Sequence, residues 1–80
     1  MLNQCVIVGR VKDFFQNELT IQADEERIVV ELTGTILQNA LDYLKVEDLV
    51  GIKGKILNGN KIHAEKITFL SSNRGGEDYV

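Results

Sequence analysis

The chain has 80 residues, enough for one small domain with a modest hydrophobic core. With 44% hydrophobic and 26% charged residues, its composition excludes a wholly disordered chain. Its net charge of −3 argues against an avid binder of polyanions, because such domains are usually basic. The longest purely apolar run, 5–8, has four residues, so we expect no membrane-spanning helix, and no signal-peptide pattern is present. The single cysteine, Cys5, is typical of a cytoplasmic protein.

Charge is segregated along the chain. Residues 1–12 contain two basic side chains and no acidic one, whereas residues 13–31 contain six acidic side chains and one arginine. Residues 45–66 contain five lysines and three acidic side chains. We therefore expect an acidic hairpin between two mildly basic regions.

The first half of the chain predicts three strands. Residues 2–11 are rich in β-branched side chains, which predicts a strand. Apolar and polar residues alternate over 19–23 and again over 28–33, which predicts two half-buried strands. The acidic segment Asp24-Glu25-Glu26 between them fits a solvated hairpin turn.

A helix is predicted over residues 36–44. Gly34 releases the preceding strand, and Thr35 is the expected N-cap. The apolar residues fall at helical spacing and form one stripe, which we expect to close one end of the fold: Ile36, Leu37, Ala40, Leu41 and Leu44.

Two more strands are predicted, over 50–56 and 62–69. Asn58-Gly59-Asn60 between them is a strong signal for a tight turn, because asparagine and glycine tolerate positive φ. The inward parity changes at Glu65 and Lys66, which predicts either a β-bulge or an irregular strand end. With this parity Phe69 is a core residue.

The predicted order of strand, strand, strand, helix, strand, strand is that of an all-β fold, the OB-fold. This is a five-stranded Greek-key barrel with one helix between strands 3 and 4. We expect residues 1–70 to form the barrel and residues 71–80, which are mostly polar, to form a flexible tail.

Four collinear segments resemble the bacterial single-stranded DNA-binding protein (SSB) family. Residues 1–11 resemble its first strand, 40–45 the end of its helix, 49–56 its fourth strand and 64–70 its fifth. The sequence departs from the family in having short connections where members carry long arms, and Thr33 where we expect the family's strand-three tryptophan. The family's long tail with an acidic tip is also missing.

The resemblance implies weak, salt-dependent binding of single-stranded DNA without sequence preference, in DNA replication, recombination or repair. The fold binds single strands with a basic groove and aromatic platforms. Lysines on one strand face can also simply solvate the sheet. Of the adjacent rings of Phe14 and Phe15, either one stacks on bases, or one plugs the barrel while the other covers an interface. The DNA-binding residues predicted in this way are Arg10, Lys12, Phe14, Phe15, Lys53, Lys55, Lys61 and His63.

The first strand also predicts self-association. Cys5 and Ile7 lie on one face and Val6 and Val8 on the other, and a small barrel buries only one face of a strand. In the family the first strand forms the dimer seam. We therefore expect a homodimer or homotetramer through Gln4, Cys5, Val6, Ile7 and Val8.

No chemistry beyond binding is predicted. His63 and Cys5 lack metal-ligand spacing, and 51–55 lacks the spacing of a phosphate-binding loop, so we expect no enzyme, no metal and no cofactor. Two alternatives use the same fold. One is a protein-interaction or oligomerisation module, an accessory that contacts replication or repair proteins, and the other is RNA binding.

Overall fold

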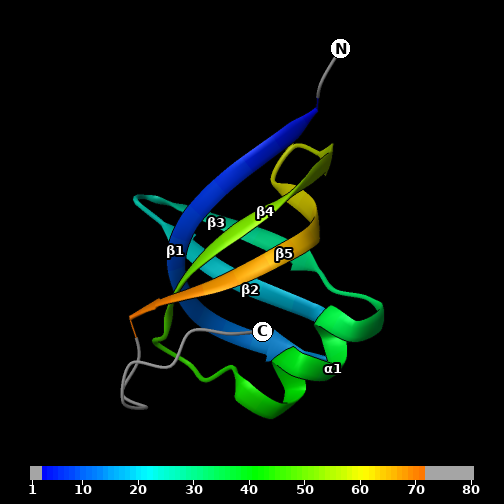
Figure 1. Cartoon of the computed structure of the whole chain (residues 1–80). Helices are drawn as coiled ribbons and strands as arrows, with labels where there is room; N and C mark the ends of the chain where they lie inside the picture. The colour runs from blue at the N-terminus through cyan, green and yellow to red at the C-terminus, as the bar shows by residue number, and fades with distance from the viewer. Residues whose placement is uncertain (1–2, 72–80) are drawn as a thin grey trace.

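The computed structural model describes residues 3–71, and the strands in it close into a barrel of order β1-β2-β3-β5-β4 (Figure 1). Residues 1–2 lie outside this range, as does the predicted tail 71–80 except for Ser71, which belongs to the last strand. The strands and the helix are β1 (Gln4–Phe15), β2 (Glu18–Ala23), β3 (Glu26–Glu31), α1 (Gly34–Tyr43), β4 (Leu49–Asn58) and β5 (Lys61–Ser71). Five strands with one helix between β3 and β4 confirm the predicted OB-fold.

The long strand β1 connects the two halves of the barrel. Its first part is antiparallel to β4, from Gln4 opposite Lys55 to Arg10 opposite Leu49. Its second part turns away and is antiparallel to β2, as far as Phe15 opposite Glu18. A short parallel ladder between β3 and β5 closes the barrel (Figure 1).

The core consists of inward-facing residues of all five strands, Leu32 directly after β3, and one residue of the helix. Alternate side chains of a strand point to opposite faces, so each strand contributes every second residue. Phe69, 3% exposed, is a core residue as predicted. The buried apolar residues are Val11, Leu19, Ile21, Ile28, Val30, Leu32, Ala40, Val50, Ile52, Ile62, Ala64, Ile67 and Phe69.

Among the register shifts of the barrel, one on β5 and one on β1 adjust the strand parity. On β5, Lys53 lies opposite Lys66 but Gly54 lies opposite Ala64, so Glu65 is an extra residue and the predicted bulge is confirmed. It lets both Ala64 and Ile67 face the core. On β1, Val11 lies opposite Ile21 but Asp13 lies opposite Thr20, which makes Lys12 extra.

The structure corrects two details of the predicted elements. β1 continues past residue 11 to Phe15, because the bulge at Lys12 interrupts the alternation without ending the strand. The helix cap is Thr33, not Thr35, and its side chain donates or accepts no capping hydrogen bond. Gly34, which follows Thr33, has a φ of +60° and changes the direction of the chain there.

The helix α1 covers one end of the barrel, as predicted (Figure 1). Ala40 is fully buried, and Ile36, Leu37 and Leu44 pack against the core. The prediction for Leu41 is wrong, because this side chain is 59% exposed. It is rotated about 100° from Ala40 around the helix, which takes it away from the barrel.

The loop between α1 and β4 is held against β1 at its bulge. The Glu47 amide donates to the Val11 carbonyl (2.7 Å), and the Val11 amide donates to the Asp48 carbonyl (2.9 Å). The buried Asp48 carboxylate accepts a hydrogen bond from the Lys45 amide (3.0 Å). These contacts fix Glu47, whose φ is +77°, directly beside the basic residues of β1.

Candidate nucleic-acid interface

One row of side chains crosses the outer surface of four strands. Cross-strand neighbours run from Phe15 on β1 to Glu18 on β2, Glu31 on β3 and His63 on β5. A second row lies beside it, with Thr20, Val29 and Lys61. We call this surface the β2–β3 face and define it by Phe15, Glu18, Thr20, Val29, Glu31, Lys61 and His63.

The two adjacent phenylalanines point to opposite sides of β1. Phe14 is half-buried and packs against the core, whereas Phe15 is 68% exposed. An extended strand cannot turn both rings inward, because successive side chains alternate. Phe15 is therefore the ring of this pair that can reach a ligand, and it lies next to Glu18 on the β2–β3 face.

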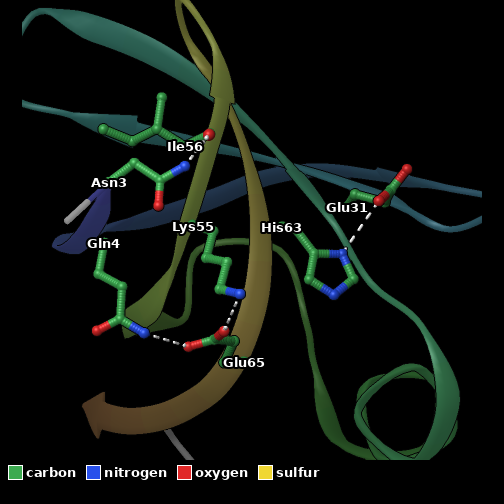
Figure 2. Close-up of polar contacts among 7 residues, drawn as sticks. All are labelled: Asn3, Gln4, Glu31, Lys55, Ile56, His63 and Glu65. Atoms are coloured by element: carbon green, nitrogen blue, oxygen red, sulfur yellow. Dashed lines mark hydrogen bonds and ion pairs between the residues drawn. The ribbon is translucent and has the colours of Figure 1, made fainter. Parts of the chain in front are cut away.

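The lysine and the histidine of the β2–β3 face are each paired with a carboxylate. Lys61 Nζ lies 3.0 Å from Glu18 Oε2, and His63 Nδ1 lies 3.0 Å from Glu31 Oε1 (Figure 2). The hydrogen bond to Glu18, followed by the negative charges of Glu18 and Glu31, raises the pKa of Lys61. The positive charge of Lys61 is therefore offset by the neighbouring carboxylates of Glu18 and Glu31.

Arg10 and Lys12 form a second basic group, beside the α1–β4 loop. Lys12 Nζ contacts Glu47 Oε2 at 2.8 Å, and Arg10 Nη1 donates to the Glu47 carbonyl at 3.1 Å. The Lys12 hydrogen bond and the charges of Lys12 and Arg10 lower the pKa of Glu47. Both predicted cations of β1 are thus held by the same residue.

Lys53 lies on a different surface, which we call the β1–β4–β5 face. This face carries a groove of about 300 Å³ lined by Val6, Val8, Gly51, Ile52, Lys53, Lys66, Thr68 and Leu70. Lys53 lies opposite Val6 on one side and Lys66 on the other. The predicted phosphate contact Lys53 and the predicted seam residues Val6 and Val8 therefore share one surface, so changing Lys53 affects both.

Lys55 lies between the two faces. It is opposite His63 on β5 and opposite Gln4 on β1. Glu65 contacts both Gln4 and Lys55. Gln4 Nε2 donates to Glu65 Oε1 (3.1 Å), and Lys55 Nζ lies 4.0 Å from Glu65 Oε2 (Figure 2).

The predicted seam residues divide between the inside and the outside of the barrel. Cys5 and Ile7 are half-buried and pack against the core, and burial raises the pKa of the Cys5 thiol. Val6 is 72% exposed and Val8 is 50% exposed, with Leu70, 50% exposed, in the same groove. The accessible part of the predicted seam is thus Gln4, Val6 and Val8.

The end of the barrel opposite α1 contains a cavity of about 490 Å³. Cys5, Ile7, Ile28, Ile56 and Ile62 line its wall, together with Glu26, Gly59 and Asn60 at the hairpin turns. The side chains are mainly apolar, and the cavity opens between the start of β1 and the β4–β5 turn.

The carboxylates of the site were not among the residues predicted from the sequence. Glu18, Glu31, Glu47 and Glu65 each contact a residue predicted to bind DNA. The alternation of β2 and β3 places Glu18 and Glu31 outward, so their side of the sheet was predictable from the sequence. Their partners are set by the pairing of β3 with β5, which the sequence does not specify.

Five cations within residues 3–71 make no ion pair. They are Arg10, whose guanidinium donates to a backbone carbonyl, and Arg27, Lys45, Lys53 and Lys66. The same residues contain no group of three or more histidine, cysteine, aspartate or glutamate side chains placed to hold a metal ion. None of the described helices is long and apolar enough to span a membrane.

The closed barrel and its intervening helix define an OB-fold domain. The fold is similar to that of the mitochondrial single-stranded DNA-binding protein Rim1 from S. cerevisiae, with a TM-score of 0.79 and 15% sequence identity. The similarity covers 90% of this chain and 98% of the Rim1 chain. No protein-family model and no curated protein matches the sequence. At this identity the likeness shows the fold.

Proposed function

We propose that the chain binds single-stranded DNA weakly and without sequence preference, through the β2–β3 face of its OB-fold. The observation that carries the proposal is the exposed Phe15 ring in one row with the Lys61–Glu18 and His63–Glu31 pairs. OB-folds bind oligonucleotides over strands 2 and 3. The fold similarity to Rim1, a single-stranded DNA-binding protein, supports this ligand class.

In this proposal, a base stacks on Phe15 while neighbouring phosphates contact Lys61, His63 and Lys55. Every base offers an aromatic face, so stacking on Phe15 does not discriminate between sequences. Arg10 and Lys12 extend the basic path along β1. Binding is weak because one exposed aromatic ring serves this face, and because its cations are shared with carboxylates.

The first test is fluorescence anisotropy of a labelled oligothymidine titrated with the whole chain. We expect saturable binding at low salt that weakens steeply toward physiological salt, about 0.15 M. Each phosphate neutralised on a single strand contributes roughly −0.7 to the slope of log affinity against log salt. A slope near −2 would correspond to three contacts.

Absence of binding even at low salt would exclude the proposed function and favour the second candidate, a protein-interaction module. The observation in favour of that candidate is that the described cations of the β2–β3 face are already paired. Competition with unlabelled oligouridine separates RNA binding from DNA binding. Stronger competition by oligouridine than by oligothymidine would overturn the preference for DNA.

We further propose that the β1–β4–β5 face forms a homodimer or homotetramer contact. Val6, Val8 and Leu70 expose apolar surface around a groove, and such contiguous patches mark interaction sites. Their twofold packing would cover the outer face of β1, which the barrel leaves uncovered. We also place the protein in the cytoplasm, in DNA replication, recombination or repair.

Val6→Asp is expected to dissociate this oligomer, raising its dissociation constant by roughly tenfold or more, because a charged side chain is costly to bury in an apolar contact. Sedimentation velocity over a concentration series measures the change. Leu41→Asp is the matched control, since Leu41 is also highly exposed but lies on α1. Equal effects of the two substitutions, or a monomeric parent chain, would exclude this contact.

A further inference from the structure

Two ion pairs, Lys61–Glu18 and Lys12–Glu47, place carboxylates beside lysines that the proposed function assigns to phosphate binding. We infer that Glu18 and Glu47 limit the affinity for nucleic acid by occupying Lys61 and Lys12, the amino groups that phosphates must reach. Glu31 acts on His63 in the same way. This inference rests on the proposed function, and it identifies the residues that set the strength of binding.

The geometry places each carboxylate at the position of a competing phosphate. Glu47 Oε2 lies 2.8 Å from Lys12 Nζ, and Glu18 Oε2 lies 3.0 Å from Lys61 Nζ, both within hydrogen-bond distance. A carboxylate and a phosphate present the same kind of anionic acceptor to an ammonium group. A DNA strand that binds must therefore displace the carboxylate or share the lysine ammonium group with it.

The pairs are accessible to a polyanion. The side chains of Lys12 and Lys61 are 31% and 33% exposed, and those of Glu47 and Glu18 are 59% and 47% exposed. Surface ion pairs of this kind are weak, at about 0–1 kcal/mol, because water screens them. Phosphates can therefore displace these carboxylates, and the pairs reduce affinity rather than abolish binding.

The carboxylates also repel a bound strand. Glu18 lies directly opposite Glu31 on the β2–β3 face, so two negative charges lie within the row that leads from Phe15 to His63. Phosphates of a strand stacked on Phe15 pass close to both. Removing the negative charge of Glu18 therefore frees Lys61 and removes a repulsion at the same place.

The experiment compares Glu18→Gln, Glu47→Gln and the double variant with the parent chain. Glu25→Gln is the matched control, because it makes the same change in net charge at the exposed β2–β3 turn, where Glu25 holds no cation. Oligothymidine affinity is measured by anisotropy at several salt concentrations. Thermal unfolding followed by circular dichroism verifies that each variant is folded.

We expect each single variant to bind roughly two- to fivefold more tightly than the parent at low salt, and the double variant roughly tenfold. The slope of log affinity against log salt should become more negative by up to about 0.7 for each cation that gains a phosphate contact. Glu25→Gln should remain within twofold of the parent.

Two results would overturn the inference while the proposed function stands. One is a parent chain that binds oligothymidine while Glu18→Gln and Glu47→Gln bind no more tightly than it does. The other is an equal gain for Glu25→Gln, which would show an effect of net charge alone. Absence of binding by every chain, the double variant included, would exclude both the inference and the proposed function. Binding by the double variant but not by the parent would exclude the proposed function of the parent chain and support the inference that these carboxylates limit affinity.

Discussion

Gly54→Ala is expected to destabilise the barrel by roughly 3 kcal/mol or more, the largest effect of any substitution considered for this chain. A Cβ atom built at Gly54 would collide with the carbonyl oxygen of His63 on β5. It would also lie 2.9 Å from the His63 carbonyl carbon and 3.0 Å from Ile62 Cγ2. The first two atoms belong to the backbone, so relief requires β4 and β5 to separate.

Separation of these strands is costly because Gly54 lies at the bulge that sets the register of the pair. Ala64 is opposite Gly54, and Glu65 is the extra residue beside it. Ala64 and Ile67, on either side of the bulge, are both buried in the core. A domain of this size has little stability to lose, so the variant should be largely unfolded at 37 °C.

Gly51→Ala is the matched control for Gly54→Ala. It makes the same change on the same strand, but its Cβ meets only the Leu70 side chain, at 3.6 Å, which is ordinary contact. Urea unfolding of both variants at one protein concentration gives the comparison. Similar midpoints for the two variants would contradict the close packing of β4 against β5.

Phe15→Ala is expected to weaken oligothymidine binding roughly 5- to 150-fold, because stacking on an aromatic platform contributes about 1–3 kcal/mol per base. The ring is 68% exposed, so its removal leaves no cavity in the core. Phe15→Trp should retain binding, since a larger ring preserves the platform. Anisotropy titrations at low salt measure all three chains.

The control for Phe15→Ala is Leu41→Ala. Leu41 is a comparably exposed apolar residue, but it lies on α1 and outside the β2–β3 face. Its removal should leave affinity unchanged. If Phe15→Ala also left the affinity unchanged, the DNA strand would have to bind elsewhere. The surface around Arg10 and Lys12 would then be the next candidate.

Most of the fold was predictable because its determinants are local. Alternating apolar residues on β2, β3 and β4, the Asn58-Gly59-Asn60 turn and the phase change at Glu65 each act within a few residues. The errors arose where a local rule has an exception. The bulge at Lys12 interrupts a strand that continues, and Leu41 is apolar in a helix whose buried side is narrower than its sequence pattern suggests.

The site was less predictable because it depends on which strands become neighbours. Phe15 lies beyond the bulge at Lys12, which the sequence did not reveal. Strand parity alone therefore does not tell which side of the sheet its ring faces. The pairs Lys61–Glu18 and Lys12–Glu47 join residues far apart in the chain, so no local pattern reports them. Lys53 and Val6 were assigned to different functions, and only the pairing of β1 with β4 shows that they share one surface.

Two of the three hairpin turns are positions at which this chain can lengthen. Asp24 and Glu25 connect β2 to β3, Gly59 and Asn60 connect β4 to β5, and all four residues are exposed. An insertion inside a strand would shift every neighbour around a closed ring, whereas one at either turn leaves all the ladders in register. Doubling the length of a flexible loop costs only about 0.6 kcal/mol. Over evolution, arms of very different length can therefore be gained or lost at these two positions while the barrel itself is retained.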